Sequence, residues 1–339
     1  MAALPIAVSM GDPAGIGLEI AVRAWLGRTS ATPPFYLIAD SAAVMRTVAR
    51  LKLKCPIGLI AAPADAHTFF GRALPVLAEP LVAPEKPGAP DPRNAPAILS
   101  AIERAVAHAT GGEAAAVVTL PIAKAVLYDA GFAHAGHTEF IAALTKDMSW
   151  AGPRGPVMML ATSGLRVALA TIHLPLKDVA STLSTKHIVD TARVVIDAMR
   201  RDFAVPHPRL ALAGLNPHAG ERGAIGDEEA TLINPAAAIL RAEGHDVSDA
   251  RPADTLFHAE AREGYDAVIA MYHDQGLIPL KMLDFWGGVN ITLGLPVVRT
   301  SPDHGTGFDI AGEGVARPES FVAALKTASA IAARRALAP

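Results

Sequence analysis

Three short apolar segments of the chain each end at a histidine, namely His173, His218 and His273. The segments cover residues 166–173, 210–218 and 266–273, and runs of this length and composition predict buried strands of a parallel sheet. The histidines would then follow the C-terminal ends of these strands, where ligands of open α/β proteins bind. Three imidazoles that meet at one point could hold a divalent metal ion with an open coordination position.

A single histidine after a strand is more often a surface residue or a hydrogen-bonded one than a metal ligand. The repetition of the pattern favours the ligand interpretation here. His218 follows Asn216 and Pro217 and opens a glycine-rich turn, and Asp274 begins a polar group after His273 where we expect a loop. Loop residues at a sheet edge are positioned by the rigid strands before them, so the sequence predicts that all three histidines bind one metal ion.

The composition is that of a compact enzyme rather than a disordered or fibrous protein, with 339 residues, 51% hydrophobic and 19% charged. A formal net charge of -3 offers no broad basic surface, which argues against a nucleic-acid partner. Cys55 is the single cysteine, which fits a reducing cytoplasm. Neither a basic leader segment nor an uninterrupted apolar stretch of about 18 residues is present, so we expect a cytoplasmic protein without a membrane span.

Predicted strands alternate with predicted helices along the chain, which is the pattern of an α/β fold. The strands are expected over residues 6–10, 36–39, 116–120, 157–160, 167–171, 210–214, 267–271 and 289–293. The helices are expected over residues 16–26, 42–51, 95–109, 139–144, 186–200, 227–241 and 318–335. Residues 75–96 are rich in proline and glycine, and we expect a surface loop there.

Two glycine-rich segments are candidates for nucleotide binding. Residues 11–17 follow the first predicted strand, but their spacing differs from G-x-G-x-x-G, so we do not predict a Rossmann fold. Residues 299–312 resemble the His-Gly-Ser/Thr-x-x-Asp-Ile-Ala-Gly loop of isocitrate and isopropylmalate dehydrogenases, which bind nicotinamide nucleotides without a Rossmann fold. That resemblance implies cofactor contacts from His304, Gly305, Thr306 and Asp309; the alternative is a plain connection before the last helix.

Further segments, in order from the first strand to the last loop, make the resemblance more specific. They are Gly11–Gly17, Gly136-His-Thr-Glu139, His173-Leu-Pro-Leu176, 214–221, Pro252-Ala-Asp-Thr255, 271–277 and 289–296. Together they resemble the marker segments of the 4-hydroxythreonine-4-phosphate dehydrogenase family of vitamin B6 biosynthesis.

The resemblance implies an enzyme that oxidises the C3 alcohol of its phosphorylated substrate with NAD or NADP, giving a 2-amino-3-oxo acid phosphate that loses carbon dioxide. It implies a divalent metal ion (Zn, Mg or Co) on the three histidines, and a homodimer whose active sites draw histidines from both subunits. It implies the isocitrate/isopropylmalate dehydrogenase-like fold, with two α/β domains around a central cleft. We expect a nucleotide-binding domain over residues 1–135 and 300–339, and a metal-binding, substrate-binding and dimerisation domain over residues 136–299. The implied substrate contacts are His137, Thr138, Lys281, Asn290 and Arg299.

The residues themselves are compatible with this chemistry. A divalent cation on the alcohol oxygen would stabilise the alkoxide that develops as hydride leaves. Lys281 and Arg299 could bind a phosphate and a carboxylate, and Lys281 lies in an apolar stretch where a cation needs a partner. Asn290 lies in a predicted strand, and a structural role for it is as plausible as a ligand contact. His137 and Thr138 begin a predicted helix whose free amides could receive an anion, or they simply form the helix start.

The general base is open between Asp254, His137 and Lys281. We favour Asp254 because it precedes a segment expected to be a helix at the same sheet edge, although an aspartate that caps a helix would look the same.

Three positions depart from the family pattern, namely Ala123, Ala135 and Ile172. They leave the histidines intact but keep the substrate open, because related enzymes oxidise 4-phosphothreonate or 4-phosphoerythronate. A metal-dependent hydrolase or lyase that uses the same histidines to activate water is an alternative of another class, and a catalytically inactive scaffold is a third.

Overall fold

The computed structural model describes residues 4–337. Within this range the chain forms two compact units, one made of residues up to Met148 together with Pro296–Leu337, and one made of Ser149–Leu295. The chain therefore leaves the first unit once and returns to it for its last strand and helix.

The first unit is built on parallel strands in the order β3-β4-β2-β1-β5-β12. Their side chains are mostly buried, as expected when helices cover both faces of a parallel sheet. The strand bounds are β1 Ile6–Ser9, β2 Phe35–Ala39, β3 Ile57–Ile60, β4 Leu74–Ala78, β5 Val117–Thr119 and β12 Arg299–Pro302.

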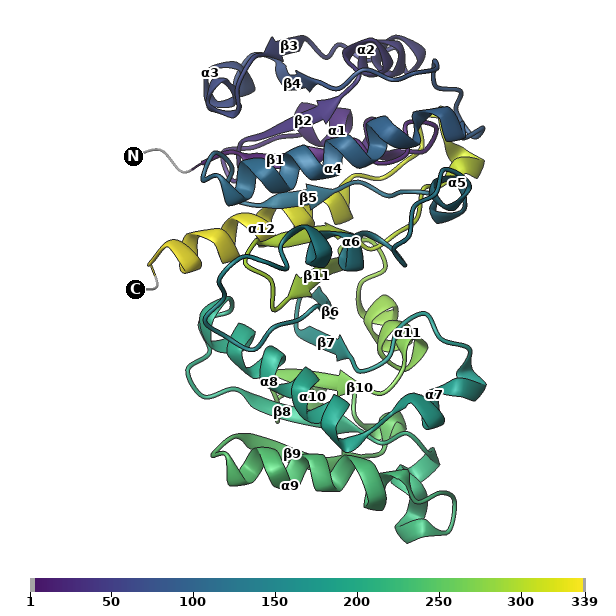
Figure 1. The fold of residues 1–339 in the computed structure, drawn as a ribbon, viewed down its shortest axis with the longest axis vertical. Helices are drawn as coiled ribbons and strands as arrows, with labels where there is room; N and C mark the ends of the chain where they lie inside the picture. The colour runs from purple at the N-terminus through teal and green to yellow at the C-terminus, as the bar shows by residue number, and fades with distance from the viewer. Residues whose placement is uncertain (1–3, 338–339) are drawn as a thin grey trace. The chain divides into compact units, whose positions relative to one another are not determined.

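Helices α2, α3, α4 and α12 of the first unit pack on strands of this sheet (Figure 1). α4 contacts β1, β2 and β5, and α12 contacts β12, β5 and β1. Asp40 caps α2, since its Oδ1 accepts a hydrogen bond from the Ala43 amide at 2.7 Å. The helix bounds are α1 Gly17–Leu26, α2 Ser41–Arg50, α3 Ala66–Phe70, α4 Ala95–Thr110, α5 Lys124–Asp129, α6 His137–Leu144 and α12 Glu319–Leu337.

The second unit has a mixed sheet in the order β11-β6-β7-β10-β8-β9. β11, β6 and β7 pair in antiparallel fashion, whereas β7, β10, β8 and β9 are parallel. The parallel part therefore has a common C-terminal edge. The strand bounds are β6 Val157–Thr162, β7 Leu165–Leu169, β8 Arg209–Ala213, β9 Asp246–Arg251, β10 Ala267–Ala270 and β11 Val289–Leu293.

Helices α8 and α11 pack directly on this second sheet. Leu280 of α11 is fully buried against side chains of β6, β7, β8 and β10, among them Leu160, Val167 and Val268. Burial of a leucine side chain contributes about 1.5–3 kcal/mol, so this contact holds α11 against the strands. The helix bounds are α7 Leu176–Thr182, α8 Thr185–Arg201, α9 Asn234–Ala242, α10 Ala259–Arg262 and α11 His273–Leu283.

The expected α/β alternation is confirmed, but three local expectations were wrong. Residues 75–96 are not simply a surface loop, because Leu74–Ala78 form β4, which is buried between β2 and β3. No loop begins after His273, because that residue is the first of α11 and Asp274 lies in the helix's first turn, where a negative charge is favourable. The helix expected over 227–241 is a π-helical turn at Glu229–Ile233 followed by α9.

No helix within residues 4–337 combines the length and the apolar character needed to cross a membrane.

Candidate active site

The three histidines follow neighbouring strands of the second unit. β7, β10 and β8 lie side by side in that order and run in the same direction. His173 follows β7, His273 follows β10 directly as the start of α11, and His218 lies in the turn after β8. The sequence pattern therefore predicted the sheet edge at which these residues lie.

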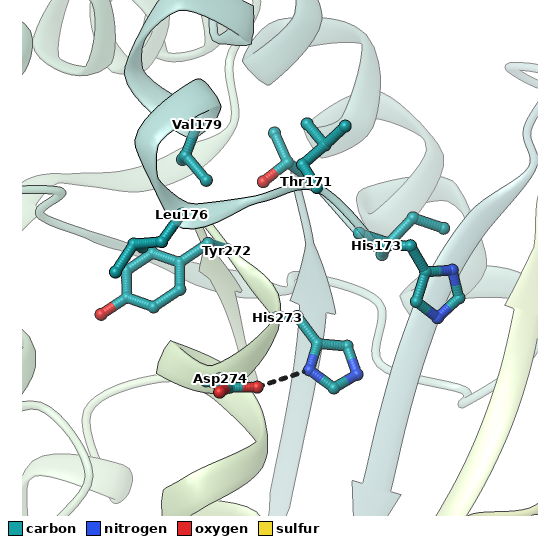
Figure 2. A pocket seen from close by; sticks show the side chains of 9 residues that line it. Thr171, His173, Leu176, Val179, Tyr272, His273 and Asp274 are labelled. Atoms are coloured by element: carbon teal, nitrogen blue, oxygen red, sulfur yellow. Dashed lines mark hydrogen bonds and ion pairs between the residues drawn. The ribbon is translucent and has the colours of Figure 1, made fainter.

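His173 and His273 form a close pair, with ring centroids 5.9 Å apart (Figure 2). Nδ1 of His273 donates a hydrogen bond of 2.7 Å to the Asp274 carboxylate, which lies on the side of the ring away from His173 in Figure 2. This bond fixes the ring orientation and leaves Nε2 as the nitrogen with a lone pair. Two imidazoles on one ion would have centroids roughly 5–6 Å apart, given metal–nitrogen bonds of about 2 Å.

The backbone at two of the histidines is strained. His173 has φ 47° and His218 has φ 53°, and non-glycine residues rarely adopt such left-handed conformations. The turn Pro217–Gly223 that carries His218 is held from outside by Glu229, whose carboxylate accepts hydrogen bonds from the Asn216 amide at 2.7 Å and from its side chain at 3.0 Å. Glu229 is almost fully buried. The turn is thus anchored to the next helical segment.

Two cavities open at this edge of the second unit. One of about 410 Å³ is lined by the His173 and His273 pair, Asp274, Tyr272 and apolar side chains of α7 (Figure 2). The other, of about 290 Å³, is lined by His218 and Asp254. Tyr272 lines both cavities. The structure therefore brings Asp254 to His218 and His173 to His273.

Within residues 4–337 no group of three or more His, Cys, Asp or Glu side chains is arranged to hold a metal ion. The donors present nevertheless fit a divalent ion, because two imidazoles lie close together and one is hydrogen-bonded to a carboxylate, a partner typical of metal-binding histidines. His218, the third ligand candidate, does not join this pair within a single chain.

The remaining candidates of the second unit lie apart from both cavities. Lys281 is two turns further along α11 than His273, about 12 Å along the helix axis, and its ammonium lies 5.3 Å from the centre of the Phe285 ring. Asn290 pairs with Leu160 in the β11–β6 ladder, and its side-chain Oδ1 is buried without a hydrogen-bond partner in the described residues. An unsatisfied amide oxygen of this kind is what a ligand contact would complete.

Arg299 of the first unit is a buried cation, only 3% exposed. Its Nη2 donates to Thr119 Oγ1 at 2.7 Å, which joins β12 to the end of β5. Burial lowers the pKa of the Arg299 guanidinium from 12.5 to about 10, with a smaller opposing effect from Glu139. The guanidinium is thus a charge that its burial disfavours.

His137 lies at the start of α6, near the same arginine. Burial, together with the charges of Arg299 and Lys124, holds the pKa of His137 well below 6.5, so its imidazole is neutral at physiological pH. Its Nε2 is shielded from solvent and has no hydrogen-bond partner among the described residues. Thr138 follows it in the first turn of α6. The first unit therefore assembles a buried cation, a neutral imidazole and a helix start.

The glycine-rich loop with His304, Gly305, Thr306 and Asp309 packs against the start of α1 in the first unit. The Thr306 carbonyl accepts the Ile16 amide at 2.9 Å, and a side chain at Gly15 would place its Cβ 2.7 Å from that oxygen. Asp309 lies in a 3₁₀ turn, Phe308–Ile310, after a left-handed Gly307. The Thr306 carbonyl therefore occupies the backbone amide of Ile16, the N-cap residue of α1.

Comparison with known proteins identifies the family of this chain. The model of the family described as "Pyridoxal phosphate biosynthetic protein PdxA" matches residues 31–328. The chain belongs to the PdxA family. It is 55% identical over 335 residues to the 4-hydroxythreonine-4-phosphate dehydrogenase of Maricaulis maris, covering 98% of both chains, and 52% identical to that of Caulobacter vibrioides, covering 99% of both.

Solved structures of PdxA-family proteins agree with this assignment. The crystal structure of 4-hydroxythreonine-4-phosphate dehydrogenase from Klebsiella pneumoniae is similar with a TM-score of 0.85 and 40% identity, covering 98% of both chains. The isocitrate/isopropylmalate dehydrogenase-like fold expected from the sequence is thereby confirmed.

Sequence reasoning missed three polar residues that the PdxA fold brings to the candidate site residues. Thr119 binds Arg299, Lys124 acts on the charge of His137, and Asp274 orients His273. Adjacency to His273 could have indicated Asp274. Thr119 carries no such local pattern, since its partner Arg299 lies 180 positions away in the chain.

Proposed function

We propose that this chain is a 4-hydroxythreonine-4-phosphate dehydrogenase of pyridoxal phosphate biosynthesis. It oxidises the C3 alcohol of 4-phosphohydroxy-L-threonine with NAD or NADP, and the resulting 2-amino-3-oxo acid phosphate loses carbon dioxide to give 3-amino-2-oxopropyl phosphate. The observation that carries this proposal is the imidazole pair of His173 and His273, backed by Asp274, in a chain similar over its whole length to enzymes of that name.

The three histidines would hold a divalent metal ion (Zn, Mg or Co), with His173 and His273 as its paired ligands and His218 as the third. Such an ion, when bound, acts as a Lewis acid toward the alcohol that is oxidised. We propose that Asp254 accepts the hydroxyl proton while hydride passes to the nicotinamide ring. Asp254 lines a cavity with His218, whereas His137 is a weak base because its pKa lies well below 6.5.

We further propose which residues bind the polar and charged groups of the substrate. Arg299 binds one anionic group of the substrate, the phosphate or the carboxylate, through a buried charge-assisted contact. His137 and Thr138 bind the anion with an imidazole and with the amides of the helix start. Lys281 and Asn290 bind further polar groups, and His304, Gly305, Thr306 and Asp309 contact the nucleotide.

We further propose that the enzyme is a homodimer whose active sites use histidines of both copies. The single chain does not add His218 to the pair, and α11 with the segment after it exposes apolar side chains that a second copy would cover. Ile278 is 64% exposed and Met282 82%. In sedimentation experiments the Met282→Lys variant should be a monomer with lowered turnover; a dimeric and fully active variant would count against this surface.

One assay tests the activity and separates it from the alternatives. NADH or NADPH formation is followed with 4-phosphohydroxy-L-threonine, 4-phosphothreonate and 4-phosphoerythronate, each with and without chelator. We expect turnover with the first substrate, and its loss with chelator. Preference for either of the other two would reassign the substrate, and metal-dependent consumption of substrate without nucleotide reduction would favour a hydrolase or lyase.

A further inference from the structure

Buried side-chain hydrogen bonds join the ends of the three strands that carry the histidines. The Thr171 hydroxyl donates to the Met271 carbonyl at 2.7 Å, and the Met271 amide donates to Gln275 Oε1 at 2.7 Å. The same Gln275 side chain donates through Nε2 to the Gly214 carbonyl at 2.6 Å. These bonds, which we call the strand-end brace, connect the chain after β7, β10 and β8 through the backbone of Met271.

The brace continues the sheet where its backbone ladder stops. The last backbone bond between β7 and β10 runs from the Ala170 amide to the Ala270 carbonyl at 2.8 Å, one residue before Thr171 and Met271. Beyond that point the chains diverge into the loops that carry the histidines. Beyond the strand ends, the side-chain hydrogen bonds of the brace therefore fix the separation of neighbouring segments, as the backbone hydrogen bonds do within the strands.

Each member of the brace lies close to a candidate ligand along the chain. Thr171 is two residues before His173, Met271 is two residues before His273, and Gly214 is four residues before His218. Gln275 and Gly214 also line the cavity of His218. A shift at any of these backbone groups would move an imidazole.

The brace is rigid because its groups are buried. Met271 is 0% exposed, Thr171 5% and Gln275 8%. Breaking one bond would leave a buried peptide group unsatisfied, at a cost of about 1–3 kcal/mol. Gln275 satisfies two such groups at once, so its side chain has one orientation in the folded protein.

We propose that Thr171 and Gln275 are positioning residues that set the spacing of His173, His218 and His273 and thereby the affinity of the metal centre. This inference rests on the proposed function, because it takes the three histidines as ligands. The inference holds whether the three histidines of one chain bind the same ion or two ions that are shared with a second copy. In both cases the brace fixes the spacing of the histidines within one chain.

The test measures binding of cobalt(II) by chelator competition, together with the visible absorption bands of the bound ion, which report ligand geometry. Thr171→Val and Gln275→Met remove the brace with little change in side-chain size. Both should lower cobalt affinity by about 10–100-fold, as is typical for partners of metal ligands, and should shift the bands. Turnover should fall with them, while the KM for the nucleotide stays unchanged.

Matched variants separate positioning from general stability. Thr171→Ser keeps the hydroxyl and should restore wild-type affinity and bands. Thr162→Val removes a hydroxyl that binds Asp284 at 3.1 Å at another end of the same unit, and should leave cobalt binding unchanged. If Gln275→Met fails to fold, Thr171→Val against Thr171→Ser carries the test.

The two proposals fail in different ways. Wild-type affinity and bands in folded Thr171→Val would overturn the brace, while a loss of cobalt in His218→Ala and His273→Ala would leave the proposed function standing. If alanine variants of all three histidines bind cobalt as the wild type does, the metal centre is overturned, and the brace with it.

Discussion

Replacement of Arg299 by methionine should weaken substrate binding strongly while leaving the ligand-free protein as stable as the wild type, or more stable. The guanidinium is 3% exposed, and burial lowers its pKa from 12.5 to about 10. Because one pKa unit corresponds to about 1.4 kcal/mol, the buried charge costs the folded state about 3 kcal/mol. Arginine is charged in the folded and the unfolded protein at neutral pH, so this cost is fully present there and is relieved only above about pH 10.

The methionine keeps most of the buried aliphatic volume and loses the bond to Thr119. That bond from a charged donor is worth about 1.5–3 kcal/mol, so the two effects nearly cancel and the free energy of unfolding should change by roughly 0 to +2 kcal/mol. Binding of the anionic substrate loses a charge-assisted contact of similar size. Its dissociation constant should rise by about 10–150-fold.

Urea unfolding of the ligand-free protein and calorimetric titration with 4-phosphohydroxy-L-threonine measure the two quantities. Arg317→Met is the matched control, because Arg317 is exposed in the same unit and pairs at the surface with Glu319. The control should change neither quantity appreciably. A variant at Arg299 that is destabilised by more than about 2 kcal/mol and binds substrate normally would refute the reasoning, because Arg299 would then serve the fold and not the ligand.

Two further predictions concern other residues of the first unit. Because the pKa of His137 is held well below 6.5 in the folded state, the unfolded chain takes up a proton first as pH falls, so stability drops below about pH 6.5. Between about pH 7.5 and 5.5, the free energy of unfolding measured with urea should therefore fall by about 1 kcal/mol less in His137→Asn than in the wild type. An equal fall in the two proteins would contradict the burial of the neutral ring. Gly15→Ala places a methyl group 2.7 Å from the Thr306 carbonyl and should raise the KM for NAD roughly tenfold, an effect of about 1.4 kcal/mol. Gly71→Ala, which meets nothing within 4 Å, is its control, and an unchanged KM for NAD in Gly15→Ala would separate this loop from the nucleotide.

Local patterns were sufficient to predict most of the elements and the residues at their ends. The strands that precede His173, His218 and His273 are mostly apolar, and burial on both faces is the reason such segments form parallel strands. The same patterns failed at β4, where Pro75 within the strand and Pro80 after it obscure a buried strand, and at α11, where a polar start looks like a loop. Strand β9 has few buried side chains and gave no alternation to detect.

The sequence by itself determined which chemical groups follow which strands, because that information is contained in neighbouring residues. Only the tertiary structure decided which groups meet. Thr171 binds Met271 across 100 positions of the chain, and Arg299 binds Thr119 across 180. Contacts of this separation depend on strand order and register, which arise from packing of the whole sheet and leave no periodic trace in the residues on either side.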